Sequence, residues 1–184
     1  MKINVGLIGK GKWVQKIKKK LNKLANLKFI YGKKSNYTKI IKKEKIQWAF
    51  IATPNSTHYK IVKECIQNGV NVYCEKPLSE SVDETKKLID LAKKKKVKLF
   101  VSDLYNYYSN KVNKLKIENL VYRSKLVNKL DKEFFYRFMY HDISILHKFF
   151  KKNKLINCSV YKKSKKNIFK IKILFKNKKS LIFL

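Results

Sequence analysis

The first hundred residues alternate short apolar runs with segments of helical periodicity, and this alternation limits the possible folds more than any other feature of the sequence. The apolar run Ile3–Ile8 comes first, and Lys12–Leu24 follows it with Val14, Ile17, Leu21 and Leu24 on one helical face. Strands that alternate with helices in this way are typical of a parallel sheet with helices packed on its faces. We therefore predict an α/β fold built on a parallel sheet.

The same alternation continues to about residue 103. Further strands are expected at Leu27–Tyr31, Trp48–Ala52, Val70–Cys74 and Val97–Ser102. Helices are expected from Asn36 to about Glu44, at Ser56–Asn68 closed by Gly69, and after a capping box formed by Ser81 and Glu84. In that last helix the predicted buried residues are Val82, Leu88, Ile89 and Ala92, and Lys93–Lys96 end the helix at its negative pole.

Beyond Asp103 the pattern changes, and we predict two domains, 1–103 and 104–184, of which the second is a reduced α+β domain. Its helices are expected at Tyr105–Leu115 and Tyr140–Phe150, and its strands at Leu120–Leu126, Asn157–Tyr161, Ile168–Phe175 and Leu181–Leu184. The last strand is an apolar run without a polar tail. It therefore needs a neighbouring strand from its own domain or from another subunit.

The net charge of +34 raises the question of nucleic-acid binding. Only two of the 46 basic residues are arginine, Arg123 and Arg137, although arginine suits bidentate contacts with bases and phosphates. The lysines are spread along the chain, and Lys, Asn, Ile, Tyr and Phe all have A/T-rich codons, so compositional drift accounts for the charge. A basic nucleic-acid-binding protein stays as an alternative. In either case the charge attracts anionic ligands such as dinucleotide phosphates.

Two further features bear on location. No apolar run approaches the roughly 20 residues that a membrane span needs, and the apolar run at the start is too short for a signal peptide. The three cysteines, Cys65, Cys74 and Cys158, lie far apart without metal-binding spacing. We therefore expect free thiols, no metal and a cytoplasmic location.

A glycine-rich turn follows the first predicted strand. The pattern Gly6-x-x-Gly9-x-Gly11 spans the junction of this strand and the first helix, which Lys12 and Trp13 open, and these five residues are expected to bind the cofactor. Glycines at such a junction let the backbone approach a pyrophosphate at the positive helix N-terminus. The last glycine of the G-x-G-x-x-G pattern is replaced by a valine, and a glycine-containing turn without phosphate is the alternative.

The end of the second predicted strand lacks the acidic residue that often holds the ribose of a dinucleotide. Lys33, Lys34 and Ser35 stand there instead. These residues suit a 2′-phosphate, which makes NADP as well as NAD a candidate cofactor. A solvated lysine turn explains them equally well.

Two later blocks have a specific pattern. Ala49–His58 reads AFIATPNSTH, and Gly69–Leu78 reads GVNVYCEKPL, with a predicted helix between them. In order and spacing, both blocks resemble signatures of the Gfo/Idh/MocA oxidoreductase family. The resemblance covers residues 3–110 well and 117–150 faintly. It implies a Rossmann-type NAD(P)-binding domain followed by a second domain that carries substrate contacts and subunit pairing, so a homodimer is expected.

The resemblance also implies roles for individual residues. Thr53, Pro54, Asn55 and His58 are expected beside the cofactor, and so are Glu75 and Pro77. Lys76 is expected next to the nicotinamide as a catalytic and substrate-binding residue. Its ammonium group can hydrogen-bond the hydroxyl being oxidised and stabilise the developing alkoxide.

The segment Phe138–Leu146 resembles the second-domain helix of the family, whose histidine is the acid/base partner of the lysine. This implies a catalytic and substrate-binding role for His141, and a structural histidine is the alternative. The family places an Asp four residues before that histidine, where this chain has Arg137. Arg137 is a candidate for binding an anionic substrate group.

The chain is much shorter than typical members, and the segment between the second strand and Trp48 is compressed. These departures leave two function hypotheses beside nucleic-acid binding. The first is an NAD(P)-dependent oxidoreductase acting on a sugar, sugar acid or nucleotide-sugar. The second is a non-catalytic relative that binds a nucleotide or a partner protein.

Overall fold

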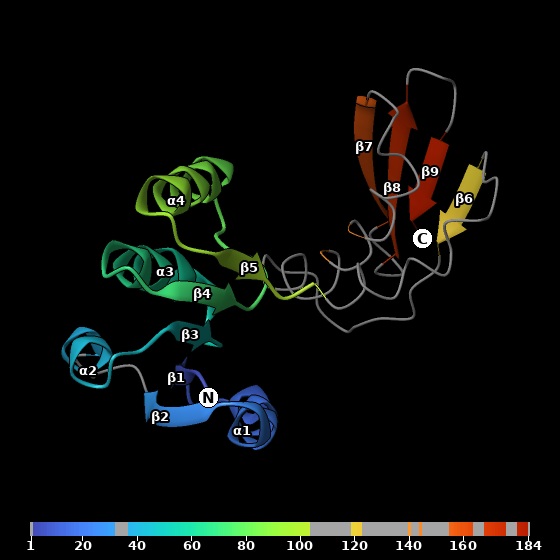
Figure 1. Ribbon diagram of the computed structural model, residues 1–184. Helices are drawn as coiled ribbons and strands as arrows, with labels where there is room; N and C mark the ends of the chain where they lie inside the picture. The colour runs from blue at the N-terminus through green and yellow to red at the C-terminus, as the bar shows by residue number, and fades with distance from the viewer. Residues whose placement is uncertain are drawn as a thin grey trace. The chain divides into compact units, whose positions relative to one another are not determined.

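A computed structural model describes residues 2–31, 37–103, 119–122, 140, 144, 155–163, 168–175 and 180–183. The chain divides into two compact units, Met1–Ser102 and Asp103–Leu184 (Figure 1). Each unit is described by itself.

The first unit is a five-stranded parallel sheet with helices on both faces, which confirms the predicted α/β fold. Its strands are β1 (Asn4–Ile8), β2 (Asn26–Tyr31), β3 (Trp48–Ile51), β4 (Asn71–Cys74) and β5 (Leu99–Val101), in the order β2-β1-β3-β4-β5. Its helices are α1 (Lys12–Leu24), α2 (Tyr37–Lys43), the 3₁₀ turn η1 (Asn55–Thr57), α3 (His58–Gln67) and α4 (Val82–Lys95).

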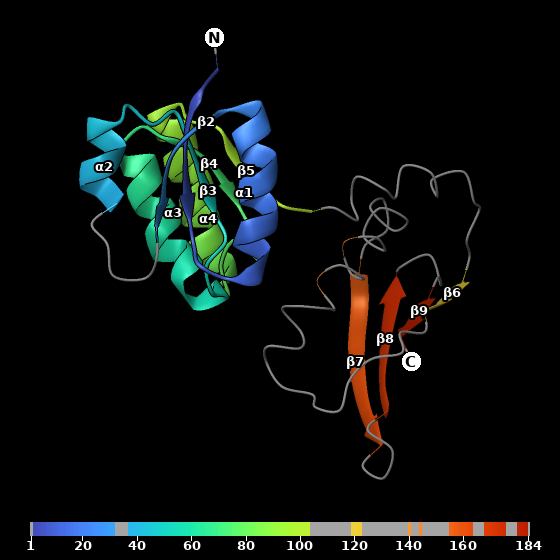
Figure 2. The same cartoon turned by 90° about the horizontal axis from the view of Figure 1, so that it is seen from below.

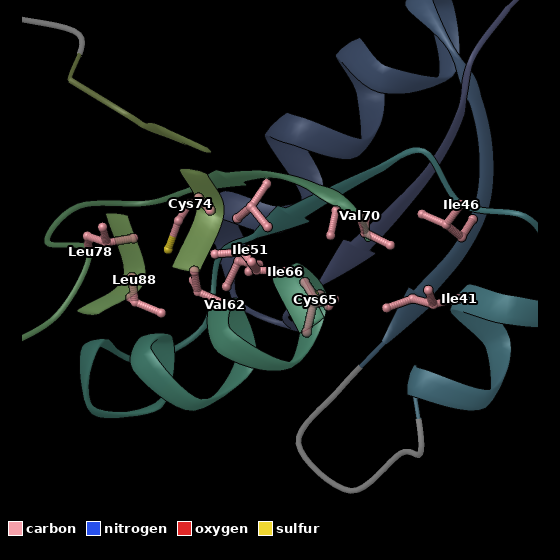
Figure 3. Packing of buried hydrophobic residues seen from close by; sticks show 14 residues of the cluster. Ile41, Ile46, Ile51, Val62, Cys65, Ile66, Val70, Cys74, Leu78 and Leu88 are labelled. Atoms are coloured by element: carbon pink, nitrogen blue, oxygen red, sulfur yellow. The ribbon is translucent and has the colours of Figure 1, made fainter. Parts of the chain in front are cut away.

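The helices divide between the two faces of this sheet. Helix α1 covers one face, and α2, α3 and α4 cover the other, as Figures 1 and 2 show. The larger core lies under α3 and α4, where Ile51, Val62, Ile66 and Leu88 are buried together (Figure 3). Such a side chain contributes about 2 kcal/mol when it leaves water, so this packing holds the strand ends in place.

In helix α4, fewer residues are buried than the apolar pattern of the sequence predicted. Ser81 caps the helix as predicted, because its side chain accepts a hydrogen bond from the backbone N–H of Glu84. The predicted buried stripe is only half right. Leu88 and Ala92 are buried, whereas Val82 is 71% exposed and Ile89 is 40% exposed. Val82 is the first residue of the helix.

The described part of the second unit contains a four-stranded sheet in the order β6-β9-β8-β7. Its strands are β6 (Asn119–Tyr122), β7 (Leu155–Lys163), β8 (Ile168–Phe175) and β9 (Ser180–Phe183). β9 lies between β6, to which it is parallel, and β8, to which it is antiparallel. The last strand therefore finds both neighbours within its own unit.

Two predicted helices of the second unit are not tested. The expected helix Tyr105–Leu115 lies outside the described residues, and of Tyr140–Phe150 only Tyr140 and Ser144 are described, both as helical. No helix within the described ranges is both long and apolar enough to cross a membrane.

Candidate functional site

Three loops leave the first sheet side by side at its carboxyl edge. Ile8 of β1 pairs with Ile51 of β3, and Ile51 pairs with Cys74 of β4. Just beyond each strand the backbone continues the ladder, because the Ala52 N–H donates to the Ile8 carbonyl and the Glu75 N–H to the Ile51 carbonyl, both at 2.8 Å. The glycine turn, the Thr53 loop and the Lys76 loop therefore begin in one row.

The strand order places these loops at a special point of the sheet. β2 lies on one side of β1 and β3 lies on the other, so the crossover direction reverses between β1 and β3. Open α/β sheets bind ligands at such a switch point, outside the carboxyl ends of the strands. The glycine turn after β1 and the Thr53 loop after β3 flank this point.

Gly6 in β1 and the two glycines of the turn, Gly9 and Gly11, have different surroundings. Gly9 has a φ of +144°, and a Cβ there would lie 2.3 Å from the Ala52 carbonyl oxygen, so the turn needs glycine to pass β3. A Cβ on Gly6 would lie 2.3 Å from the Phe29 ring, so Gly6 lets β2 pack closely. A Cβ on Gly11 would meet no atom within 4 Å. Packing within the protein therefore does not require a glycine at residue 11.

The N-terminus of α1 begins at this open position. Gly11 is its N-cap without a side-chain cap, and the first turn contains no acidic residue. Lys12 and Trp13 are exposed in this turn. The first turn of the helix thus contributes no side-chain anion of its own, and its N–H groups suit an anionic group.

Trp13 connects the glycine turn with the Lys76 loop. Its indole Nε1 donates a hydrogen bond of 2.7 Å to Oε1 of Glu75, and the ring is 43% exposed. The Lys16 ammonium lies 5.4 Å from the centre of the same ring. Sequence analysis placed Trp13 and Glu75 separately beside the cofactor and missed their contact, because a hydrogen bond between residues 62 positions apart leaves no local pattern.

The Thr53 loop holds its shape through hydroxyl groups. The Thr57 Oγ1 lies 2.7 Å from the Pro54 carbonyl oxygen and 2.7 Å from the Thr53 Oγ1. A carbonyl only accepts, so the Thr57 hydroxyl donates to Pro54 and accepts from Thr53. Asn55, half-buried, then opens the 3₁₀ turn η1.

His58 lies inside the protein between two of these loops. Its side chain is fully buried at 0% exposure. Its Nδ1 lies 2.7 Å from the Pro77 carbonyl oxygen, and its Nε2 lies 2.9 Å from the Thr53 carbonyl oxygen. Both ring nitrogens are therefore engaged by the backbone. A direct contact of His58 with a cofactor stays a prediction.

Lys76 is held from both sides by its neighbours. The Glu75 N–H is bonded to β3, and the Pro77 carbonyl lies against His58. The Lys76–Pro77 peptide bond is cis. Pro77 and Leu78 are buried, whereas Lys76 and Glu75 are half-buried. The lysine thus starts from a fixed piece of backbone at the carboxyl edge of the sheet.

Four of the predicted site residues lie in parts of the chain that the structure does not describe. Lys33 and Ser35, expected at the 2′-phosphate, lie outside the described residues, and so do Arg137 and His141. Their roles stay predictions.

The second unit contains a contact that sequence analysis missed. The Ser144 hydroxyl donates to the carboxylate of Asp103, and the pKa of Tyr140 is raised by burial and by the negative charge of Asp103. Tyr140 and Ser144 are four residues apart, which places both on one face of a helix. This spacing was visible in the sequence, but nothing in it marked Asp103 as their partner.

A parallel α/β sheet with a glycine turn after its first strand defines a Rossmann-type protein. Residues 13–103 match the family GFO_IDH_MocA, described as "Oxidoreductase family, NAD-binding Rossmann fold". Residues 13–103 belong to this oxidoreductase family, which confirms the resemblance seen in the sequence.

Curated relatives match part of the chain, and solved structures share its fold. An inositol 2-dehydrogenase from Rubrobacter xylanophilus is 37% identical over 51 residues, which are 28% of this chain and 15% of the relative. The UDP-N-acetylglucosamine 3-dehydrogenase GnnA from Acidithiobacillus ferrooxidans has a similar fold, with a TM-score of 0.81 and 16% identity over 100% of this chain and 69% of that chain. GenD2 from gentamicin A biosynthesis, solved in complex with NAD, has a TM-score of 0.73 and 13% identity over 99% of this chain and 65% of that one. The matched segments span only 15–20% of the first curated relatives.

Proposed function

We propose that this chain binds NAD or NADP at the carboxyl edge of its first sheet and acts as an oxidoreductase on a sugar, a sugar acid or a nucleotide-sugar. One observation carries the proposal. The glycine turn, the Thr53 loop and the Lys76 loop leave three paired strands in one row, at the switch point of the sheet.

The residues present fit a dinucleotide. The space beside Gly11 accepts a ligand where a Cβ would project, and the first turn of α1 offers N–H groups and contains no acidic residue of its own. We assign the pyrophosphate to this turn. Thr53, Asn55 and the Trp13–Glu75 pair would line the path from the turn to Lys76. The nicotinamide supplies a carbon that accepts or releases a hydride.

In this proposal, Lys76 is the catalytic residue that contacts the substrate oxygen. Its ammonium group donates a hydrogen bond to the substrate oxygen and stabilises the negative charge that develops there as hydride leaves the neighbouring carbon. The fixed backbone on both sides of Lys76 limits the positions that the amine can reach. His141 is proposed as its acid/base partner, which accepts the hydroxyl proton as hydride passes to the nicotinamide, and Arg137 is proposed as a contact for an anionic substrate group. Pairing of two copies through the second unit, and a cytoplasmic location, belong to the same proposal.

A thermal melting screen tests the cofactor part. Millimolar NAD⁺, NADH, NADP⁺ and NADPH are added separately to the full chain. A ligand present at 100 times its Kd stabilises the folded state by about 2.7 kcal/mol, which raises the melting temperature by several degrees. If none of the four dinucleotides changes the melting temperature, the cofactor assignment is wrong.

A turnover assay tests the chemical part. Sugars, sugar acids and nucleotide-sugars are offered with the dinucleotide that binds, and formation of the reduced nicotinamide is followed at its absorbance band. Lys76→Met should keep the melting shift and lower turnover by about 10²- to 10⁴-fold. Lys60→Met, an exposed lysine of α3, is the matched control and should leave turnover unchanged.

A non-catalytic nucleotide-binding relative is the second candidate. β2 is the edge strand of the described sheet, so no described strand extends the adenosine side beyond it. A melting shift with a dinucleotide, combined with no turnover across the whole substrate panel, would favour this candidate over the enzyme.

A further inference from the structure

His58 is the buried polar side chain that joins two of the three loops at the candidate site. It is the first residue of α3, and the core residues Val62 and Ile66 follow on the buried face of the same helix. Its ring lies between the Thr53 carbonyl, five residues earlier, and the Pro77 carbonyl, 19 residues later. A helix anchored in the core thus carries a ring that contacts both loops.

The contact with Pro77 completes the support of Lys76. On one side of the lysine, the Glu75 N–H donates to Ile51 at 2.8 Å. On the other side, the Pro77 carbonyl lies 2.7 Å from the His58 Nδ1. The backbone on either side of Lys76 is therefore attached to a different element, β3 and α3 respectively. Without the ring, the attachment of Pro77 to α3 would be lost.

The chemistry of the two contacts is directional. A backbone carbonyl oxygen only accepts hydrogen bonds, so each ring nitrogen must carry a proton for its contact to be favourable. A neutral imidazole carries one N–H and an imidazolium carries two. An apolar residue of the same size would fill the space but could not donate to either carbonyl.

We propose that His58 is a positioning residue, which fixes the Lys76 loop through the Pro77 carbonyl and the Thr53 loop through the Thr53 carbonyl. It acts through these loops and does not touch the reacting atoms. The part of this proposal that concerns turnover rests on the proposed oxidoreductase function. The part that concerns the loops does not.

The side chain offers variants that separate its two contacts. In His58→Asn, the amide nitrogen stands near the place of Nδ1 and can donate to Pro77. In His58→Gln, the amide nitrogen stands near the place of Nε2 and can donate to Thr53. His58→Leu donates to neither. Val62→Ala is the matched control, since Val62 is fully buried one turn further along α3.

Backbone hydrogen exchange of the full chain without ligand tests the loops directly. We expect exchange in peptides covering residues 75–79 to rise about tenfold in His58→Gln and His58→Leu, and to stay near wild type in His58→Asn. Peptides covering residues 53–57 should behave in the opposite way in the two amide variants. Equal exchange in the Asn and Gln variants, or the same pattern in Val62→Ala, overturns the proposal.

Kinetics tests the consequence for Lys76, with NAD⁺ or NADP⁺ and the sugar that the turnover panel identifies. His58→Leu and His58→Gln should lower kcat by about 100-fold, because small displacements of a catalytic group have effects of this size. The KM for the dinucleotide should change little in His58→Gln, and His58→Asn should recover most of kcat. If wild type shows no turnover, the proposed function fails, while the exchange result still decides the role of His58.

A spectroscopic measurement on wild type covers the case in which the variants do not fold. A buried ring N–H bonded to a carbonyl exchanges slowly with water, so a ¹H–¹⁵N spectrum should show a protected imidazole N–H with a contact to residue 77 or residue 53. A His58 ring without any protected N–H would overturn the proposal.

Discussion

Trp13 donates an indole hydrogen bond of 2.7 Å to the carboxylate of Glu75, and this bond joins the first helix to the residue that precedes Lys76. The two residues stand 62 positions apart: Trp13 lies in the first turn of α1, which follows β1, and Glu75 lies on the loop that leaves β4. β3 lies between these strands, so the contact passes over the end of β3. It brings the proposed pyrophosphate turn and the proposed catalytic lysine into one connected surface.

Removing the acceptor of this bond should change the environment of Trp13 with little effect on stability. In a Trp48→Phe background, Trp13 is the remaining tryptophan of the two in the chain. Glu75→Ala should shift its emission to longer wavelength and lower the free energy of unfolding by about 1 kcal/mol or less, since the contact is exposed. Glu75→Gln keeps an acceptor oxygen and is the control. Identical spectra for the Ala and Gln variants would contradict the contact.

Two glycines of one turn should respond in opposite ways to alanine. Gly9→Ala places a Cβ against the Ala52 carbonyl at a φ of +144°, and we expect a loss of about 3 kcal/mol in the free energy of unfolding. Gly11→Ala meets open space, so its free energy of unfolding should stay within about 0.5 kcal/mol of wild type. Denaturant unfolding of both variants measures this contrast.

The Gly11→Ala variant also tests the cofactor assignment. If the pyrophosphate approaches the backbone at residue 11, the added methyl group lies in its path, and the melting shift with dinucleotide should shrink strongly or disappear. An unchanged shift would place the dinucleotide elsewhere. Lys10→Ala, an exposed neighbour outside the helix, serves as the comparison.

Stability should fall at high pH because of two buried thiols. Burial raises the pKa of Cys65 from 9.0 to about 12 and raises that of Cys74 well above 9.0, with the charge of a neighbouring glutamate adding to each effect. The unfolded chain therefore releases these protons first, so stability is fully present below pH 9 and is lost as the pH rises from 9 toward 12. Urea unfolding between pH 8 and 11 should show this decline. A Cys65→Ala, Cys74→Ala double variant should show a shallower decline, and equal slopes would argue against thiol titration as the cause.

Removing the cap of α4 should weaken the first unit by a defined amount. The Ser81 side chain accepts from the Glu84 N–H at 3.4 Å, so Ser81→Ala should lower the free energy of unfolding by about 1 kcal/mol. Ser56→Ala changes an exposed serine without a described hydrogen bond and is expected to have almost no effect. Thermal or urea unfolding distinguishes the two variants, and equal stabilities would show that the cap contributes nothing.

Local pattern determined much of the first unit. Helix Lys12–Leu24 was predicted with both its ends, because one face repeats apolar residues at helical spacing. Alternating strands and helices predicted the parallel sheet, and the two blocks around Thr53 and Lys76 predicted the family. In all these cases the physical cause lies within a few residues of the chain, so it can be read from the chain alone.

Tertiary structure decided which of these residues meet. The sequence gives no reason for His58 to face Pro77 or for Trp13 to bond Glu75, because both contacts depend on how β1, β3 and β4 align. The prediction that Val82 and Ile89 are buried was also wrong. Helical spacing indicates which residues share a face of the helix, but it does not indicate how much of that face the sheet covers. Periodicity is a property of neighbours along the chain, whereas burial and the partners of a polar group are set by elements that folding brings together from distant parts of the sequence.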